Sequence, residues 1–146
     1  MIKLFLASAL FLTTIAPPNW ITDMENAKQL AKKEQKLILL NFSGSDWCIP
    51  CIRLRKEVFN TDAFATYAAD HLVLVNADFP RQKKNQPSKE QQKINDALAE
   101  RYNPQGSFPF TLLLDSNGNK LKVWDGFYKD GADNFINEIK VFTETK

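Results

Sequence analysis

The chain contains only two cysteines, Cys48 and Cys51, and two residues separate them. An apolar run over residues 37–42 precedes this pair, and a helical pattern over 52–59 follows it. A cysteine at the start of a helix has a lowered pKa, because unpaired backbone N–H groups and the positive end of the helix dipole stabilise its thiolate. Pro50 suits this position, since proline is tolerated in the first helical turn. The spacing and its context predict thiol–disulfide redox chemistry.

The two sulfurs are expected to have different roles. Cys51 shares an apolar helical face with Leu54 and Val58, so it should point into the core. Cys48 comes before the helix, where the loop after the strand should reach solvent. We therefore expect Cys48 to be the attacking thiolate and Cys51 to be the sheltered resolving thiol.

Two other interpretations of the cysteine pair stay open. A purely stabilising disulfide would close a loop of a few residues, which restricts the unfolded chain less than a longer loop does. A zinc site needs further ligands, but the sequence holds no second cysteine pair, and His71 is its single histidine. We expect no metal and no cofactor other than a redox-active Cys48–Cys51 disulfide.

The length of 146 residues suits one domain with a sizeable core, and a net charge of +2 does not favour nucleic acid as a partner. Residues 1–16 predict a secretory signal peptide, because a short positive start precedes an uncharged stretch too short to span a bilayer comfortably. An uncleaved anchor is the alternative. In either case we expect residues 17–146 to be a single domain outside the cytoplasm, where disulfides persist.

Hydrophobic periodicity predicts an α/β domain. Besides the helix after the cysteines, we expect helices over 20–36, 61–71, 90–102 and 131–142, and strands over 37–42, 72–78, 111–114 and 120–124. Trp20 should lie on the inner face of the first helix, and Ile94, Ala97, Leu98 and Tyr102 on that of the helix over 90–102. The first two strands should be parallel, and an Asn-Gly turn should join the last two as a hairpin. These elements form a three-layer α/β/α unit around a mixed sheet of about four to five strands.

A basic segment over 79–92 should leave the sheet on the side where Cys48 emerges, because the C-terminal ends of parallel strands share one edge. It includes Arg81, Lys83 and Lys84. The simpler interpretation is a solvated loop. The alternative is a positive rim that helps to dock a partner protein.

The chain resembles the thioredoxin superfamily from about residue 20 to its C-terminus. The resemblance rests on Trp47–Cys51 after a buried strand, on Phe108–Pro109 before a later strand, and on the closing hairpin and helix. The segments Phe42–Cys48 and Asp78–Arg81 are also similar to those of exported bacterial thioredoxin-like proteins with an Asp-Trp-Cys motif. The resemblance implies the thioredoxin fold.

The resemblance also implies roles for residues around the cysteines. Pro109 should be a cis-proline that faces the disulfide, and the backbone of Phe108 should pair with an extended substrate. From the residues alone, a trans proline at the start of a strand fits equally well. Trp47 should cover the disulfide and offer an apolar surface, with simple packing as the alternative, while Ile49 and Pro50 support the motif.

Three positions affect these expectations. Asn41 stands where thioredoxins carry a buried Asp; it cannot accept or deliver a proton, so deprotonation of Cys51 would need water or another acid. Phe110 replaces the usual Thr after the proline, and its ring should narrow the choice of partner. Asp46 lies close to Cys48 in the sequence and works against a very low thiol pKa, so we do not expect a strong oxidant.

These observations predict a thiol–disulfide oxidoreductase of the cell envelope, in the periplasm, that reduces disulfides in exported proteins. A thiol donor, expected in the membrane, would recharge the dithiol, and the protein is expected to be a monomer. Alternatives are a disulfide oxidase or isomerase, and a metal-handling or chaperone-like binding module. A purely structural domain is a further alternative.

Overall fold

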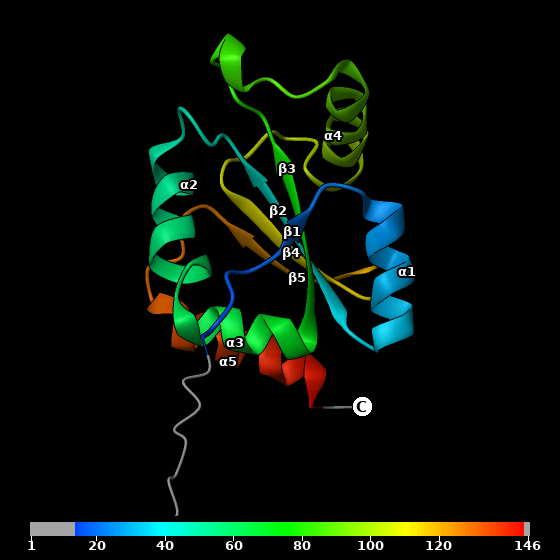
Figure 1. Cartoon of the computed structure of the whole chain (residues 1–146), viewed down its shortest axis with the longest axis vertical. Coiled ribbons are helices and arrows are strands. Elements are labelled where there is room, and N and C mark those ends of the chain that lie inside the picture. The colour runs from blue at the N-terminus through cyan, green and yellow to red at the C-terminus, as the bar shows by residue number, and fades with distance from the viewer. Residues whose placement is uncertain (1–13, 145–146) are drawn as a thin grey trace, which may run out of the picture.

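A mixed sheet forms the centre of the protein (Figure 1), seen in a computed structural model that describes residues 14–144. Within these residues the sheet has five strands in the order β1-β3-β2-β4-β5. The strands are β1 (Trp20–Ile21), β2 (Leu37–Ser43), β3 (Leu72–Asp78), β4 (Phe110–Leu114) and β5 (Lys120–Asp125). Both β1 and β2 run parallel to β3, whereas β4 is antiparallel to β2 and β5.

Helices cover both faces of this sheet (Figure 1). One face packs against α1 (Met24–Glu34) and α4 (Lys89–Tyr102), and the other against α2 (Ile49–Leu54), α3 (Asp62–His71) and α5 (Gly131–Thr143). A π-helical turn, η1 (Arg55–Phe59), continues α2, and a 3-10 turn, η2 (Lys83–Asn85), precedes α4. The predicted three-layer thioredoxin fold is confirmed. Of the predicted signal peptide, residues 1–13 lie outside the described part of the chain.

The central strand explains why the sheet is buried. All seven residues of β2 are buried, and they alternate between the two sides of the sheet. Leu37 and Leu39 pack with the layer of α2, α3 and α5, whereas Ile38, Leu40 and Phe42 pack with the layer of α1 and α4. A strand covered on both faces needs an almost continuous apolar sequence, which is the pattern that predicted it.

The first predicted helix is wrong at its start. Trp20 lies in β1 opposite Leu74, and its ring packs 5.1 Å from that of Phe59. The helix begins only after Asp23, whose side chain accepts hydrogen bonds from the backbone N–H groups of Glu25 and Asn26. An N-cap of this kind fixes the first turn, so the residues before it were free to pair with the sheet edge.

The inner face of α4 differs from the predicted one. Leu98 and Tyr102 are buried as expected, but Ala97 is exposed, Ile94 is 41% exposed and Asn95 is 3% exposed. The Asn95 side chain donates a hydrogen bond to the Asp78 backbone oxygen at 2.9 Å. This bond at the end of β3 sets the rotation of the helix, and a satisfied amide replaces an isoleucine on its buried face.

Candidate functional site

The two cysteines form a disulfide at the start of α2, just after the turn that follows β2. Cys48 is the N-cap residue of α2, and its Sγ accepts a hydrogen bond from the Cys51 backbone N–H at 3.3 Å. The Cys48 N–H donates to the Gly44 carbonyl at 2.8 Å, which closes the turn between strand and helix. Pro50 lies in the first helical turn, where no backbone donor is needed.

The predicted difference in exposure between the two cysteines is wrong for this disulfide form. Cys48 is 4% exposed and Cys51 is 6% exposed, while Ile49 between them is 66% exposed. The capping position explains the burial of Cys48, because its sulfur folds back over the first turn of α2 toward the Cys51 N–H. The feature that singles out Cys48 is therefore electrostatic: an N–H that points at its sulfur favours a thiolate there.

Trp47 packs against the strand-to-helix turn. Its Nε1–H donates to the Phe79 backbone oxygen at 2.7 Å, and the side chain is half-buried. A Cβ on Gly44 would overlap the Trp47 indole, so this close approach requires glycine. The Arg81 guanidinium carbon lies 3.7 Å from the centre of the Trp47 ring. The indole is thus held between the turn and the segment that follows β3.

The Phe108–Pro109 peptide bond is cis, the geometry that the resemblance implied. The Phe108 ring lies 5.5 Å from that of Trp47 and 5.6 Å from that of Phe79, both edge to face. Pro109 is buried, and its carbonyl accepts a hydrogen bond from the Gly126 N–H at 2.9 Å. These contacts bring the cis-proline loop and the cysteine turn to the same edge of the sheet.

Asn41 is 4% exposed and satisfied on both sides. Its amide donates to the Asn76 Oδ1 on β3 at 3.0 Å, and its Oδ1 accepts from the Thr111 hydroxyl on β4 at 3.0 Å. A carboxylate in this place could accept from Thr111 but could not donate to Asn76. The amide therefore fits its neighbours, which sequence reasoning had not identified as its partners.

The polar row continues toward the cysteines through Ser43 and Asp78. The Ser43 Oγ lies 3.2 Å from the Asn76 Oδ1 and 3.1 Å from the Asp78 Oδ1. Asp78 also accepts hydrogen bonds from the Ser45 backbone N–H at 2.9 Å and from its hydroxyl at 2.5 Å. One carboxylate at the end of β3 thus anchors the loop that carries Cys48.

Asp46 anchors a second loop. Its carboxylate accepts from the backbone N–H groups of Arg81 and Gln82 and from the Asn85 side-chain amide, each at 2.9 Å. The Arg81 N–H, together with the other two donors, holds the pKa of Asp46 below its ordinary value. The sequence suggested only that this charge opposes ionisation of Cys48. The three donors lie more than thirty residues further along the chain, and no local pattern connects them to Asp46.

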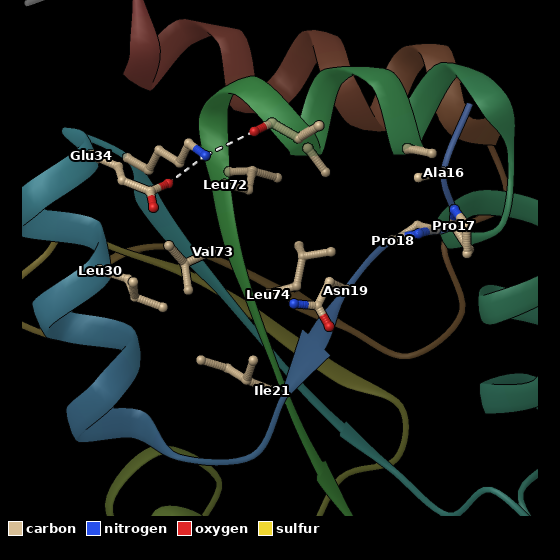
Figure 2. A pocket seen from close by; sticks show the side chains of 14 residues that line it. Ala16, Pro17, Pro18, Asn19, Ile21, Leu30, Glu34, Leu72, Val73 and Leu74 are labelled. Atoms are coloured by element: carbon tan, nitrogen blue, oxygen red, sulfur yellow. Dashed lines mark hydrogen bonds and ion pairs between the residues drawn. The ribbon is translucent and has the colours of Figure 1, made fainter. Parts of the chain in front are cut away.

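A cavity of about 330 Å³ lies at the opposite end of the sheet (Figure 2). The first residues of β3, including Leu72 and Leu74, line it together with the N-terminal segment, α1 and α3. Lys36 also lines it, and its ammonium group bonds the Glu34 carboxylate and the Ala69 carbonyl. No cysteine lines this cavity, so it takes no part in disulfide exchange, and the cysteine turn remains the candidate redox site.

Neither a metal-binding cluster nor a membrane-spanning helix is found in residues 14–144. Residues 14–144 contain no group of three or more His, Cys, Asp or Glu side chains placed to hold a metal ion. The same residues include no helix of the length and apolar character needed to cross a bilayer.

Comparisons with known proteins agree with this geometry. A sequence model of a family described as thioredoxin-like matches residues 19–116. The disulfide bond reductase DsbH of Chlamydia pneumoniae is 35% identical over 114 residues, which are 78% of this chain and 66% of that protein. The chain therefore spans just under two thirds of that relative. The thioredoxin-related protein DsbJ of the same organism is 35% identical over 60 residues, 41% of this chain and 17% of its own length.

Solved structures share the fold. A structure of a DsbH oxidoreductase superposes with a TM-score of 0.80 and 28% identity, covering 96% of this chain and 97% of that one. A disulphide isomerase from Xylella fastidiosa Temecula1 gives a TM-score of 0.60 with 21% identity, covering 80% and 87% of the two chains. The second likeness concerns the fold alone.

Proposed function

The chain belongs to the thioredoxin-like family, and from this premise we propose that it is a thiol–disulfide oxidoreductase that reduces disulfides in exported proteins. The observation that carries the proposal is the Cys48–Cys51 disulfide at the start of α2, with Trp47 and the Phe108–Pro109 loop at the same sheet edge. The reductase named among its relatives supports the direction of the reaction.

The reaction has two exchange steps. In the reduced protein, the Cys48 thiolate attacks one sulfur of a substrate disulfide; a mixed disulfide forms, and the other substrate sulfur leaves as a thiolate and takes up a proton. The Cys51 thiol then loses its proton and attacks the Cys48 Sγ. This step restores the Cys48–Cys51 disulfide and releases the second substrate thiol. Two electrons pass from the protein to the substrate, and no cofactor beyond the cysteine pair is required.

Residues around the cysteines support these steps. In the disulfide form the Cys51 N–H points at the Cys48 Sγ, and in the reduced protein the same N–H would stabilise the attacking thiolate. The Phe108 backbone would pair with an extended substrate, and Trp47 and Ile49 would offer apolar contact beside the disulfide. Because Asn41 cannot take the proton of Cys51, water or a substrate thiolate accepts it.

The working cycle needs a source of electrons. A thiol donor in the membrane would reduce the Cys48–Cys51 disulfide after each turnover, and the periplasm is the compartment that matches exported substrates. Residues 1–16 would direct the chain there as a secretory signal, and the remaining domain would act as a monomer.

Trapping variants test the proposal. Cys51→Ser should accumulate mixed disulfides with substrate proteins that dithiothreitol releases, because Cys48 can attack but nothing resolves the product. Cys48→Ser is the matched control and should trap none. Wild-type protein should also catalyse insulin reduction with dithiothreitol. Partners found only on Cys48→Ser would reverse the roles, and an absence of turnover would contradict the proposal.

Exposure gives a second test. Both cysteines are nearly buried in the disulfide form, so exposure does not distinguish them, whereas the N–H that points at the Cys48 Sγ does. Iodoacetamide should alkylate Cys48 before Cys51 at pH 7, as mass spectrometry of digests would show. Faster alkylation of Cys51 would contradict the assignment of the nucleophile. A reduction potential at the strongly oxidising end would instead make the protein an oxidase.

A further inference from the structure

A basic segment lies beside the candidate site. The chain between β3 and α4 reaches beyond the same end of the sheet as the turn from β2 to α2 (Figure 1). Arg81, Lys83 and Lys84 are all exposed on this segment, and none of them forms a salt bridge with another residue in the range 14–144. Their positive charge is therefore available to a partner molecule.

Two contacts hold this segment close to the disulfide. Asp46, two residues before Cys48, accepts three hydrogen bonds from residues 81–85. The Arg81 guanidinium carbon lies 3.7 Å from the centre of the Trp47 ring, a cation–π contact with the residue that precedes Cys48. The segment is thus fastened to the cysteine turn from both its backbone and its side chain.

Two acidic groups next to the cysteine turn, Asp46 and Asp78, already accept hydrogen bonds. Asp46 accepts from the basic segment's backbone, and Asp78 accepts from Ser45. On the neighbouring helix, Arg53 pairs with Glu57 and so adds no free positive charge. The segment that Asp46 holds beside the cysteine turn thus carries three exposed positive charges, Arg81, Lys83 and Lys84.

We propose that Arg81, Lys83 and Lys84 form a basic rim that selects substrate polypeptides with acidic residues flanking the target disulfide. The inference rests on the proposed function and adds a substrate class to it. A guanidinium binds a carboxylate through paired hydrogen bonds, and lysines add positive potential that speeds encounter with an acidic segment. Arg81 determines specificity at the binding step and takes no part in the exchange of sulfurs.

Matched peptide substrates test the basic rim. Two synthetic peptides would each carry one disulfide and differ only in flanking residues, Glu in one and Gln in the other. For wild-type protein we expect kcat/KM for the Glu peptide to exceed that for the Gln peptide by about fivefold or more. The preference should shrink in 1 M salt, where the Debye length is only about 3 Å.

Variants assign this preference to the basic rim. In R81Q/K83Q/K84Q the ratio of kcat/KM for the Glu peptide to kcat/KM for the Gln peptide should fall to about one. In R81E this ratio should be lower than in the wild type, because the new carboxylate repels the Glu peptide. K32Q/K33Q/K120Q is the matched control, because it removes three exposed positive charges away from the disulfide and should keep the wild-type ratio. Circular dichroism would show that each variant is folded.

The outcomes separate the two proposals. Wild-type reduction of both peptides at equal rates, or an equal loss of preference in the control variant, would overturn the basic rim and leave the oxidoreductase function standing. Reduction of neither peptide by wild-type protein would overturn both.

Discussion

The two faces of β2 differ in chemistry. Toward α1 and α4 the strand presents Ile38, Leu40 and Phe42, an apolar face over its whole length. Toward α2, α3 and α5 it begins with Leu37 and Leu39 but continues with Asn41 and Ser43 as it approaches the cysteine turn. The same strand therefore supplies core packing on one side and a buried polar row on the other.

The difference shows how a buried polar row can be tolerated beside a reactive site. Asn41 lies opposite Asn76 on one side and Thr111 on the other in the strand register, and it hydrogen-bonds to both. A buried polar group lowers the stability of the fold little when it is hydrogen-bonded, but it lowers it strongly when its partner is removed. The apolar face stabilises through area, whereas the polar face depends on specific partners.

The largest effect should come from the apolar face. Leu40→Ala should lower the free energy of unfolding by about 2–5 kcal/mol, because Leu40 is fully buried and a cavity would remain. Urea unfolding of the oxidised protein measures this loss. Val123→Ala, at a side chain 44% exposed on β5, is the control and should change stability by about 0.5 kcal/mol or less. Equal losses at the two positions would contradict the assigned core.

The polar face should respond through its partners. Asn41→Leu keeps a similar side-chain size but leaves the Thr111 hydroxyl without its acceptor. We expect a loss of about 1–3 kcal/mol in the free energy of unfolding. A neutral or stabilising result would mean that the polar row contributes nothing to stability.

A double-mutant cycle sharpens this point. Thr111→Val alone should cost about 1 kcal/mol, because it removes one buried hydrogen bond without changing shape much. Asn41→Leu/Thr111→Val should then cost less than the two single changes together, since no hydroxyl is left unpaired. Additive losses would show that the two side chains act independently.

The smallest effect concerns Asp46, which fastens the basic segment beyond the polar face. Its pKa is lowered on folding from an ordinary value of 3.8, chiefly by the Arg81 N–H. The lowered pKa stabilises the folded protein at any pH above the pKa of the unfolded state. This stabilisation is lost as the pH falls through the pKa of the folded state. The amide NMR signals of Arg81 and Gln82 should titrate with a midpoint below 3.8. Asp46→Asn should abolish this titration. A midpoint above 3.8 in the wild type would contradict the hydrogen bonds from residues 81–85 to the Asp46 carboxylate.

Much of the fold could be predicted because its signals are local. The apolar runs that became β2 and β3, the Asn117–Gly118 hairpin and the helix over 131–142 needed only periodicity and turn residues. Trp20 was misassigned because a two-residue strand carries too little pattern, and its pairing with Leu74 comes from the sheet edge. Ile94 was misplaced because the side chain of Asn95 bonds a backbone oxygen on another element.

The sequence by itself determined the chemistry of this protein: two cysteines at a spacing that allows a disulfide, after a buried strand and at the start of a helix. Only the tertiary structure decided how that disulfide is surrounded. It buried Cys48, placed Phe108 against Trp47, and turned Asp46 toward Arg81. Such contacts join residues far apart in the chain, so they depend on strand register and packing, which a local pattern does not contain.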